Sequence, residues 1–170
     1  MSQRHIEVLR TALKNLDASI EAGKRGVKIH ELSLIGSIKE IIGHGERVLE
    51  KGLCLSSSKE VRSAGYICEG RWVIVRAGDI ISISKVGSDI AISLRGGEFM
   101  VMRGSTGVVI GPSYLRIFID GYSEEYSFKE YRDAVARIHL FKKIVPAALE
   151  ALRRADESFT RCVKIYRVKC

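Results

Sequence analysis

The feature that most constrains this chain is a run of apolar residues near its C-terminus, spaced alternately three and four residues apart. That spacing is close to one helical turn, so it predicts a long helix with a single apolar stripe, as in a coiled coil. Ser127 and Glu130 form an S-x-x-E capping box at the expected start of this helix. The stripe comprises Tyr131, Ala134, Ile138, Phe141, Val145, Ala148, Leu152, Ala155, Phe159, Cys162 and Tyr166.

Pro146 lies inside the stripe, where it removes one helical hydrogen bond and favours a kink. The stripe keeps its phase across Pro146, so we expect one kinked helix and not two unrelated ones. Two arrangements fit: a seam between two copies of the chain, or an amphipathic helix packed on the chain's own sheet. The unbroken heptads favour a homodimer, in which Tyr131 to Val145 can still close the domain's own core. The expected dimer interface is Ala148, Leu152, Ala155, Phe159, Cys162 and Tyr166.

Two further helices are expected near the N-terminus. Apolar residues recur at helical spacing over residues 3–22 and again over residues 30–51. The second segment contains Gly36, Gly43 and Gly45, which lower helix propensity and mark a kink or a close helix contact.

The middle of the chain is rich in Ile, Val, Ser and aromatic residues, with regularly spaced turn residues. This pattern predicts strands joined by short hairpins, near residues 65–77, 79–86, 89–95, 98–103, 107–111 and 114–120. The predicted fold is therefore α+β, with N-terminal helices, an antiparallel β-meander of about five to six strands and a long C-terminal coiled-coil-like helix. We expect an α+β nucleic-acid-binding domain over residues 1–126 and a dimerisation helix over residues 127–170.

Alternation along the strands assigns side chains to two faces. Aliphatic residues such as Ile81, Ile83 and Ile117 form a core face, and the opposite face is predicted to be small, basic and aromatic. Such a face suits single-stranded nucleic acid, because each base stacked on a ring contributes about 1–3 kcal/mol and arginine neutralises phosphate. The alternative is that both faces are covered and that the aromatic residues are packing residues. The predicted nucleic-acid-binding residues are Tyr66, Trp72, Arg76, Arg95, Phe99, Arg103, Tyr114, Arg116 and Phe118.

The charge of the chain also favours a polyanionic partner. It holds 28 Lys and Arg against 20 Asp and Glu, a net charge of +8. Residues 129–170 alone carry 11 of the cations and 5 of the carboxylates, so most of the excess lies on the expected C-terminal helix. The chain has a single Asn (Asn15) and a single Gln (Gln3) beside abundant charge, a pattern typical of hyperthermophiles.

The cysteines and the N-terminus bear on location. Cys54, Cys68, Cys162 and Cys170 lack the spacing of a zinc site, and in a hyperthermophile a disulfide such as Cys54 to Cys68 is an open alternative to free thiols. The first ten residues are charged and no apolar run reaches the length of a membrane span, so we expect a cytoplasmic protein with no membrane partner.

No motif in the sequence indicates catalysis. Glycine-rich phosphate loops are missing, and His5, His30, His44 and His139 are scattered without an acidic or cysteine neighbourhood. We therefore expect a protein that is not an enzyme and that has no metal and no cofactor.

The order of N-terminal helices, an aromatic and basic sheet from Tyr66 to Phe118, and the stripe from Tyr131 to Tyr166 resembles the ThermoDBP-type single-stranded DNA-binding proteins of hyperthermophilic archaea. The resemblance covers most of the chain and implies a hydrophobic cleft flanked by basic residues, sequence-tolerant binding and dimerisation through the last helix. Pro146 and a stripe with Leu152 as its one leucine depart from that pattern.

The sequence thus predicts a non-catalytic protein that binds single-stranded DNA, or less favourably RNA, and forms a homodimer. The alternative is a structural or assembly protein, such as an archaeal viral or adaptor subunit, that uses the sheet face and the helix for protein contacts. In that case, nucleic acid would bind only through Lys142, Lys143, Arg153 and Arg154.

Overall fold

A computed structural model describes residues 2–22, 29–57, 71–127 and 138–168. Two N-terminal helices, α1 (Ser2–Ala22) and α2 (Ile29–Ser56), precede the sheet, and α5 (Ile138–Ile165) follows it. The strands are β1 (Trp72–Ala77), β2 (Ile80–Lys85), β3 (Ile90–Arg95), β4 (Glu98–Arg103), β5 (Thr106–Ile110), β6 (Tyr114–Ile119) and β7 (Tyr122–Ser127). The α+β class and the two N-terminal helices are confirmed.

The strands form one antiparallel meander whose spatial order is the order of the sequence, β1 to β7. Tight turns join them, and the turn between β3 and β4 has positive φ at both Gly96 (58°) and Gly97 (74°). Two successive residues with positive φ form a type I′ turn, whose twist matches that of the paired strands. Glycine adopts positive φ without a steric cost, which is why it is found at both positions. The sheet has one strand more than the five to six predicted, because Tyr122–Ser127 also pairs with β6.

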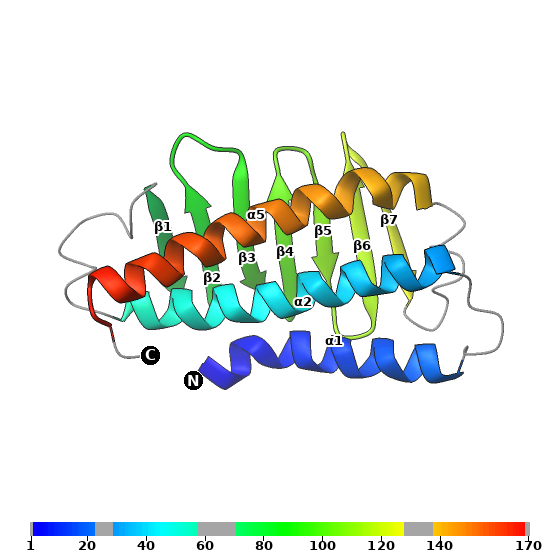
Figure 1. The fold of residues 1–170 in the computed structure, drawn as a ribbon, viewed down its shortest axis with the longest axis horizontal. Coiled ribbons are helices and arrows are strands. Elements are labelled where there is room, and N and C mark those ends of the chain that lie inside the picture. Colours follow the sequence, from blue (N-terminus) through cyan, green and yellow to red (C-terminus); the bar gives the residue numbers. More distant parts are fainter. Residues whose placement is uncertain (1, 23–28, 58–70, 128–137, 169–170) are drawn as a thin grey trace.

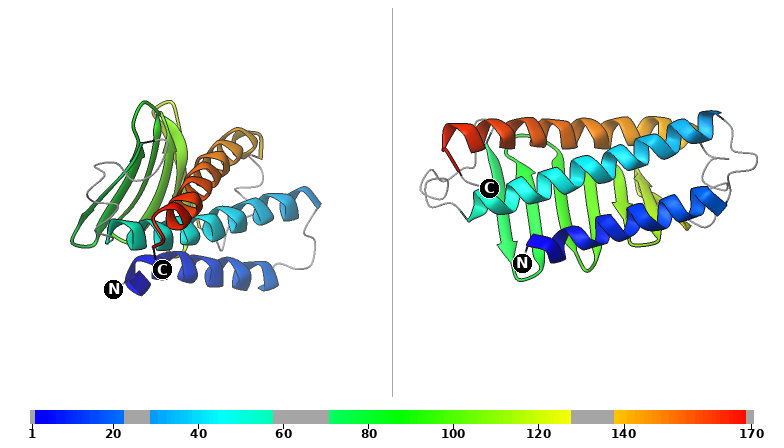
Figure 2. Two further views of the ribbon diagram at one scale, coloured as in Figure 1. Left: turned by 60° about the vertical axis from the view of Figure 1, so that its left-hand side comes forward. Right: turned by 60° about the horizontal axis from the view of Figure 1, so that its bottom comes forward.

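The molecule has two layers, with the sheet in one and the three helices in the other (Figures 1 and 2). Helix α5 runs across the strands and contacts β4, β5 and β6, and α2 lies beside it. Helix α1 packs on the other side of α2. The core lies between the layers, where strand residues such as Ile83, Ile92 and Val101 are completely buried.

Helix α5 continues through Pro146 as a single helix, as the phase of the stripe predicted. Its stripe residues Ala148, Leu152, Ala155, Phe159 and Cys162 are at most 2% exposed, and Tyr166 packs against the same core. Ile144, Leu149 and Ala151 are buried as well, so the buried side of α5 is broader than a two-helix seam.

The predicted dimer interface must therefore be corrected. Helix α2 and the sheet of the same chain already cover Ala148, Leu152, Ala155, Phe159 and Cys162, so these residues are not available to a second copy. A helix that packs on two neighbours at once needs the same apolar spacing as a coiled coil, which is why the stripe was read as a seam. The first part of the stripe, Tyr131 and Ala134, lies outside the described residues, as does Glu130 of the predicted cap; Ser127 is the last residue of β7.

Gly45 is the close helix contact that the glycines of α2 suggested. A β-carbon at Gly45 would lie 2.7 Å from a ring carbon of Phe99, so only hydrogen fits between α2 and the sheet at this point. A β-carbon at Gly36 would meet nothing within 4 Å.

Cys54 on α2 and Cys162 on α5 are both disulfide-bonded, and the described part of the chain contains no free cysteine. Cys68, the partner considered for Cys54, lies outside the described residues. Within the same described ranges, no helix combines the length and the apolar character needed to cross a membrane.

Candidate functional site

The register of the sheet decides which face each predicted binding residue occupies, because directly paired residues of antiparallel strands share a face. Ile74 pairs with Ile83 and Ile83 with Ile92; Ile83 and Ile92 are completely buried under the helices, and Ile74 is partly buried against the same core. The other side of the sheet is called the open face here, and none of the three described helices covers it (Figure 2). Its residues are Val73, Val75, Ala77, Ile80, Ser82, Ser84, Ala91, Ser93, Arg95, Glu98, Met100, Met102, Gly107, Val109, Tyr114, Arg116, Phe118, Ser123, Glu125 and Ser127.

Trp72 lies on the helix-covered face, which corrects its predicted place on the binding face. Its side chain is completely buried, and its ring meets that of Phe159 edge to face, with the centroids 5.6 Å apart and the planes at 70°. The Lys85 ammonium lies 5.8 Å from the Trp72 ring centroid. The indole N–H meets no hydrogen-bond acceptor among the described residues. Trp72 is therefore a core residue whose ring is not available to a base.

Phe99 is likewise misplaced by the sequence prediction. It pairs with Leu94 and Ile110, is completely buried, and packs under α2 at Gly45. An aromatic ring in this position fills the core and cannot stack on a ligand.

Arg103 and Arg76 also belong to the helix-covered side. Arg103 pairs with Ile90 across the strands, and its Nη1 donates to Glu150 of α5 at 2.8 Å. Arg76 pairs with Ile81, although its side chain is exposed beyond the edge of the helices. Tyr66 lies outside the described residues.

Four predicted residues do lie on the open face: Arg95, Tyr114, Arg116 and Phe118. Two of them are engaged with carboxylates. Arg116 Nη2 donates to Glu125 at 2.9 Å and lies 3.4 Å from Glu98, which also accepts a hydrogen bond from the Tyr114 hydroxyl. Burial and the bond to Glu98 raise the pKa of Tyr114 to about 12. The open face therefore offers much less free positive charge than the sequence suggested.

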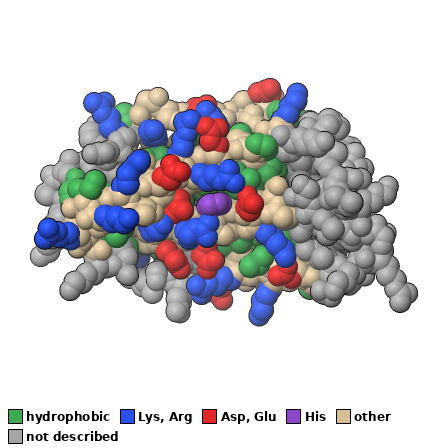
Figure 3. All heavy atoms as spheres, in the orientation of Figure 1, with side chains coloured by type: hydrophobic (Ala, Val, Ile, Leu, Met, Phe, Trp, Pro, Cys, Tyr) green, Lys and Arg blue, Asp and Glu red, His purple; other side chains and the backbone are tan. Residues whose placement is uncertain are grey.

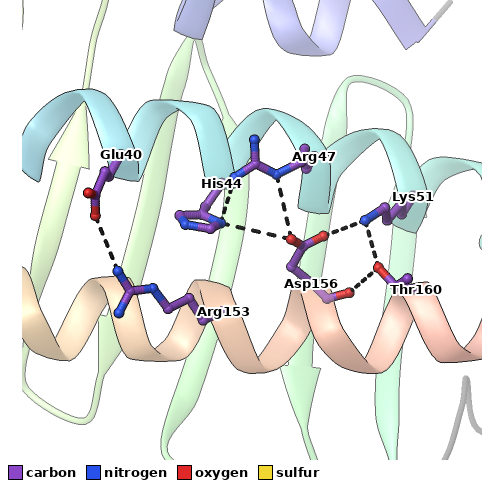
Figure 4. Close-up of polar contacts among 7 residues, drawn as sticks. All are labelled: Glu40, His44, Arg47, Lys51, Arg153, Asp156 and Thr160. Atoms are coloured by element: carbon purple, nitrogen blue, oxygen red, sulfur yellow. Dashed lines mark hydrogen bonds and ion pairs between the residues drawn. The ribbon is translucent and has the colours of Figure 1, made fainter.

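A polar network centred on Asp156 joins α2 to α5 (Figure 4). Lys51 Nζ donates to Asp156 Oδ1 at 2.6 Å and to Thr160 Oγ1 at 2.7 Å, and Arg47 Nε lies 3.5 Å from Oδ2. Both carboxylate oxygens thus face cations, so the network is a contact between helices and leaves no free carboxylate for acid–base chemistry.

His44 belongs to the same network. Burial and the positive charge of Arg47 lower the pKa of His44 below its ordinary value, although Asp156 lies 3.8 Å from Nδ1. Arg47 Nη2 lies 2.8 Å from His44 Nδ1, an arrangement in which the neutral ring accepts a hydrogen bond from the guanidinium.

Five cations without a described carboxylate partner lie where α5 ends near β1. Arg161, Lys164 and Arg167 are exposed on the last turns of α5 and just beyond it. Lys85 and Arg71 adjoin Trp72, which contacts α5 at Phe159. We call these five residues the basic end. None of them has an ion pair with a described carboxylate, and Figure 3 shows blue side chains at this end of the helix layer.

The other cations of the helix layer contrast with the basic end. Arg153 is paired with Glu40 at 3.2 Å and Arg154 with Glu150 at 2.7 Å. Arg153 and Arg154 were predicted from the sequence as possible phosphate contacts, whereas Arg161, Lys164 and Arg167 were not. The concentration of positive charge in residues 129–170 was the signal that pointed to this helix.

Comparisons with known proteins add nothing to this description: no family model, no curated protein and no solved structure matches the chain. Among the described residues, no group of His, Cys, Asp and Glu side chains is arranged to hold a metal ion.

Proposed function

We propose that this protein binds single-stranded nucleic acid without catalysis and that the basic end makes the phosphate contacts. The proposal is supported mainly by the five cations of the basic end, which no described carboxylate neutralises, in a chain of net charge +8. When clustered Lys and Arg side chains neutralise phosphates, they displace the counterions bound along the nucleic-acid backbone. The release of these counterions drives binding without sequence preference.

Apolar surface beside the cations favours a single strand over a duplex. Ile165 is 59% exposed and Tyr166 is half-buried, and both lie between Lys164 and Arg167. In a single strand the bases are free to contact such side chains, whereas in a duplex they are stacked inside. The contact surface in this proposal is therefore the end of α5 and not the aromatic sheet face that the sequence suggested.

The test is a titration of a fluorescently labelled oligonucleotide, read by anisotropy, at several salt concentrations. Each phosphate contact on a single strand contributes about −0.7 to the slope of log affinity against log salt, so five contacts give a slope of about −3.5. Replacing Arg161 and Lys164 by alanine removes two contacts and makes the slope shallower by about 1.4. With equal affinities of the variant and the wild type at 1 M salt, this difference in slope corresponds to about a 25-fold lower affinity of the variant at 0.1 M salt.

The matched control is the pair Lys14→Ala and Lys143→Ala. Both residues are exposed helix lysines outside the basic end, and their replacement changes the net charge by the same amount. This control is expected to change the affinity by less than about threefold. Equal weakening by the two pairs would indicate diffuse attraction and reject the basic end as the site, and undetectable binding by the wild type at low salt would reject the function.

A further inference from the structure

The open face differs in charge from the rest of the molecule. Its ionisable side chains are Arg95 and Arg116 with Glu98 and Glu125, so its formal charge is zero in a chain of net charge +8. Arg116 is paired with both glutamates. Two copies of the chain that approach through this face meet no net repulsion, whereas their basic ends would repel each other.

On β1 and β2 the open face carries no ionisable side chain. Its residues there are Val73, Val75, Ala77, Ile80, Ser82 and Ser84, and the pair Arg95 and Glu98 lies at the adjoining ends of β3 and β4. Val75 is 57% exposed and Ile80 39% exposed, so this end of the open face presents aliphatic side chains to solvent. Two such sheets stack face to face about 10 Å apart, with the side chains of the two faces interdigitating.

The extent of the face matches that of a stable interface. Seven strands about 4.8 Å apart, each about six residues long at about 3.4 Å per residue, span roughly 34 Å by roughly 20 Å, or about 680 Å². The side chains add relief to this flat area, so the buried surface approaches the about 800 Å² per partner of a standard interface.

We propose that the partner of the open face is a second copy of this chain, which forms a symmetric dimer by stacking sheet on sheet. A two-fold axis places the same patch on both sides of the interface, so a face of zero formal charge meets another face of zero formal charge. Twisted sheets stack with their strands about 30° apart. The basic ends lie in the helix layer and near the edge strand β1, so they stay exposed on both copies. This proposal does not depend on nucleic-acid binding.

The experiment is sedimentation velocity of the full chain between about 1 and 100 µM in 0.15 M salt, a range that covers ordinary protein association constants. The wild type is expected to sediment as two chains of 18.9 kDa. Ser82→Arg places a charge in the middle of the stacked sheets and is expected to give a monomer, with the dissociation constant raised at least 100-fold. Ser82 is exposed and makes no described hydrogen bond, so the change leaves the fold of the single chain intact.

Two controls accompany this variant. Ser113→Arg adds the same charge in the exposed turn between β5 and β6 and is expected to remain a dimer, as is the uncharged Ser82→Ala. Circular dichroism and thermal melting verify that each variant is folded. The inference is overturned if the wild type is a monomer at 100 µM, which would leave the face to another protein, or if Ser82→Arg stays dimeric or Ser113→Arg also dissociates.

The same preparations are used in the oligonucleotide titration, so the two proposals fail independently. A monomer that binds the oligonucleotide would reject the dimer alone, and a dimer that does not bind would reject the proposed function alone.

Discussion

Replacing Gly45 by alanine tests whether α2 lies as close to the sheet as the structure places it. The new β-carbon would be 2.7 and 2.8 Å from two ring carbons of Phe99 and 3.3 Å from Leu9, so the buried ring must move. Overpacking of a core costs about 1–3 kcal/mol. Against this, alanine gains about 1 kcal/mol over glycine in a helix interior.

Gly36→Ala in the same helix is the matched control, because its β-carbon would meet nothing within 4 Å and only the propensity gain remains. The free energies of unfolding of the two variants should therefore differ by about 1–3 kcal/mol, with Gly36→Ala at or above the wild type. The assay is denaturant unfolding followed by the fluorescence of the single Trp72, with the disulfides intact and at one protein concentration. A Gly45→Ala protein as stable as Gly36→Ala would refute the close contact between α2 and Phe99.

Three further substitutions test the packing of α5 and its polar network. Phe159→Ala should lower the free energy of unfolding by about 3–5 kcal/mol, whereas the control Ile165→Ala, at an exposed position of the same helix, should lower it by less than about 1 kcal/mol. Phe159→Ala should also leave the sedimentation coefficient of the folded protein unchanged. Dissociation of a dimer by this variant would instead indicate an intermolecular seam at Phe159. The pKa of His44 is lowered in the folded protein, so the unfolded chain binds the proton more readily. Stability therefore falls as the pH drops through about 6.5 and levels off below the folded-state pKa. Melting curves between pH 7.5 and 5 should show a smaller loss of stability for His44→Gln than for the wild type, and an identical loss would contradict this. Asp156→Asn leaves Lys51 without its carboxylate and should cost about 1–3 kcal/mol in denaturant unfolding, with a loss below about 0.3 kcal/mol as the contrary result.

Much of the sheet could be predicted from the sequence, and its faces could have been predicted too. Gly96 and Gly97 between Arg95 and Glu98 indicate a tight hairpin, and that turn fixes the pairing of Leu94 with Phe99. Alternation along residues 89–95 places Leu94 in the core with Ile90 and Ile92, so this pairing requires Phe99 to lie there as well. Strand 98–103 taken alone does not assign its faces, because the aromatic ring of Phe99 suits a core as well as a binding surface; the register to β3 assigns them.

The same argument applies to Trp72 at the other end of the sheet. The turn at Gly78 pairs Ala77 with Ile80, so Ile83 pairs with Ile74 and Trp72 follows on the buried side. In β1 both alternating sets contain aliphatic residues, and only the register to β2 distinguishes them. Strand β7 was missed for another reason: its sequence YSEEYS has two glutamates and no aliphatic residue, so neither its period nor its composition indicated a strand.

The packing of α5 could not be decided from its own sequence. A stripe spaced by three and four residues is required whether a helix packs on its twin or on a sheet and a neighbouring helix. What distinguishes the two is the width of the buried side, since Ile144, Leu149 and Ala151 are buried beside the stripe. These residues were visible in the sequence, but their meaning depends on how α2 lies beside α5, which is a property of the tertiary fold.

The structure exchanges the roles that the sequence suggested for the two surfaces. The stripe of α5 is buried in the core, and the open face has a formal charge of zero, so self-association is expected at the sheet and phosphate contacts at the end of α5. The two interactions should then respond to salt in opposite ways. Phosphate binding weakens as salt rises, because the counterions released from the phosphates enter a more concentrated solution and their release gains less entropy. A contact through faces of zero formal charge between two positively charged chains is not weakened, because salt screens the repulsion between the chains. A protein whose oligonucleotide affinity and dimer fraction fell together with rising salt would therefore use one charged surface for both, contrary to the separation proposed here.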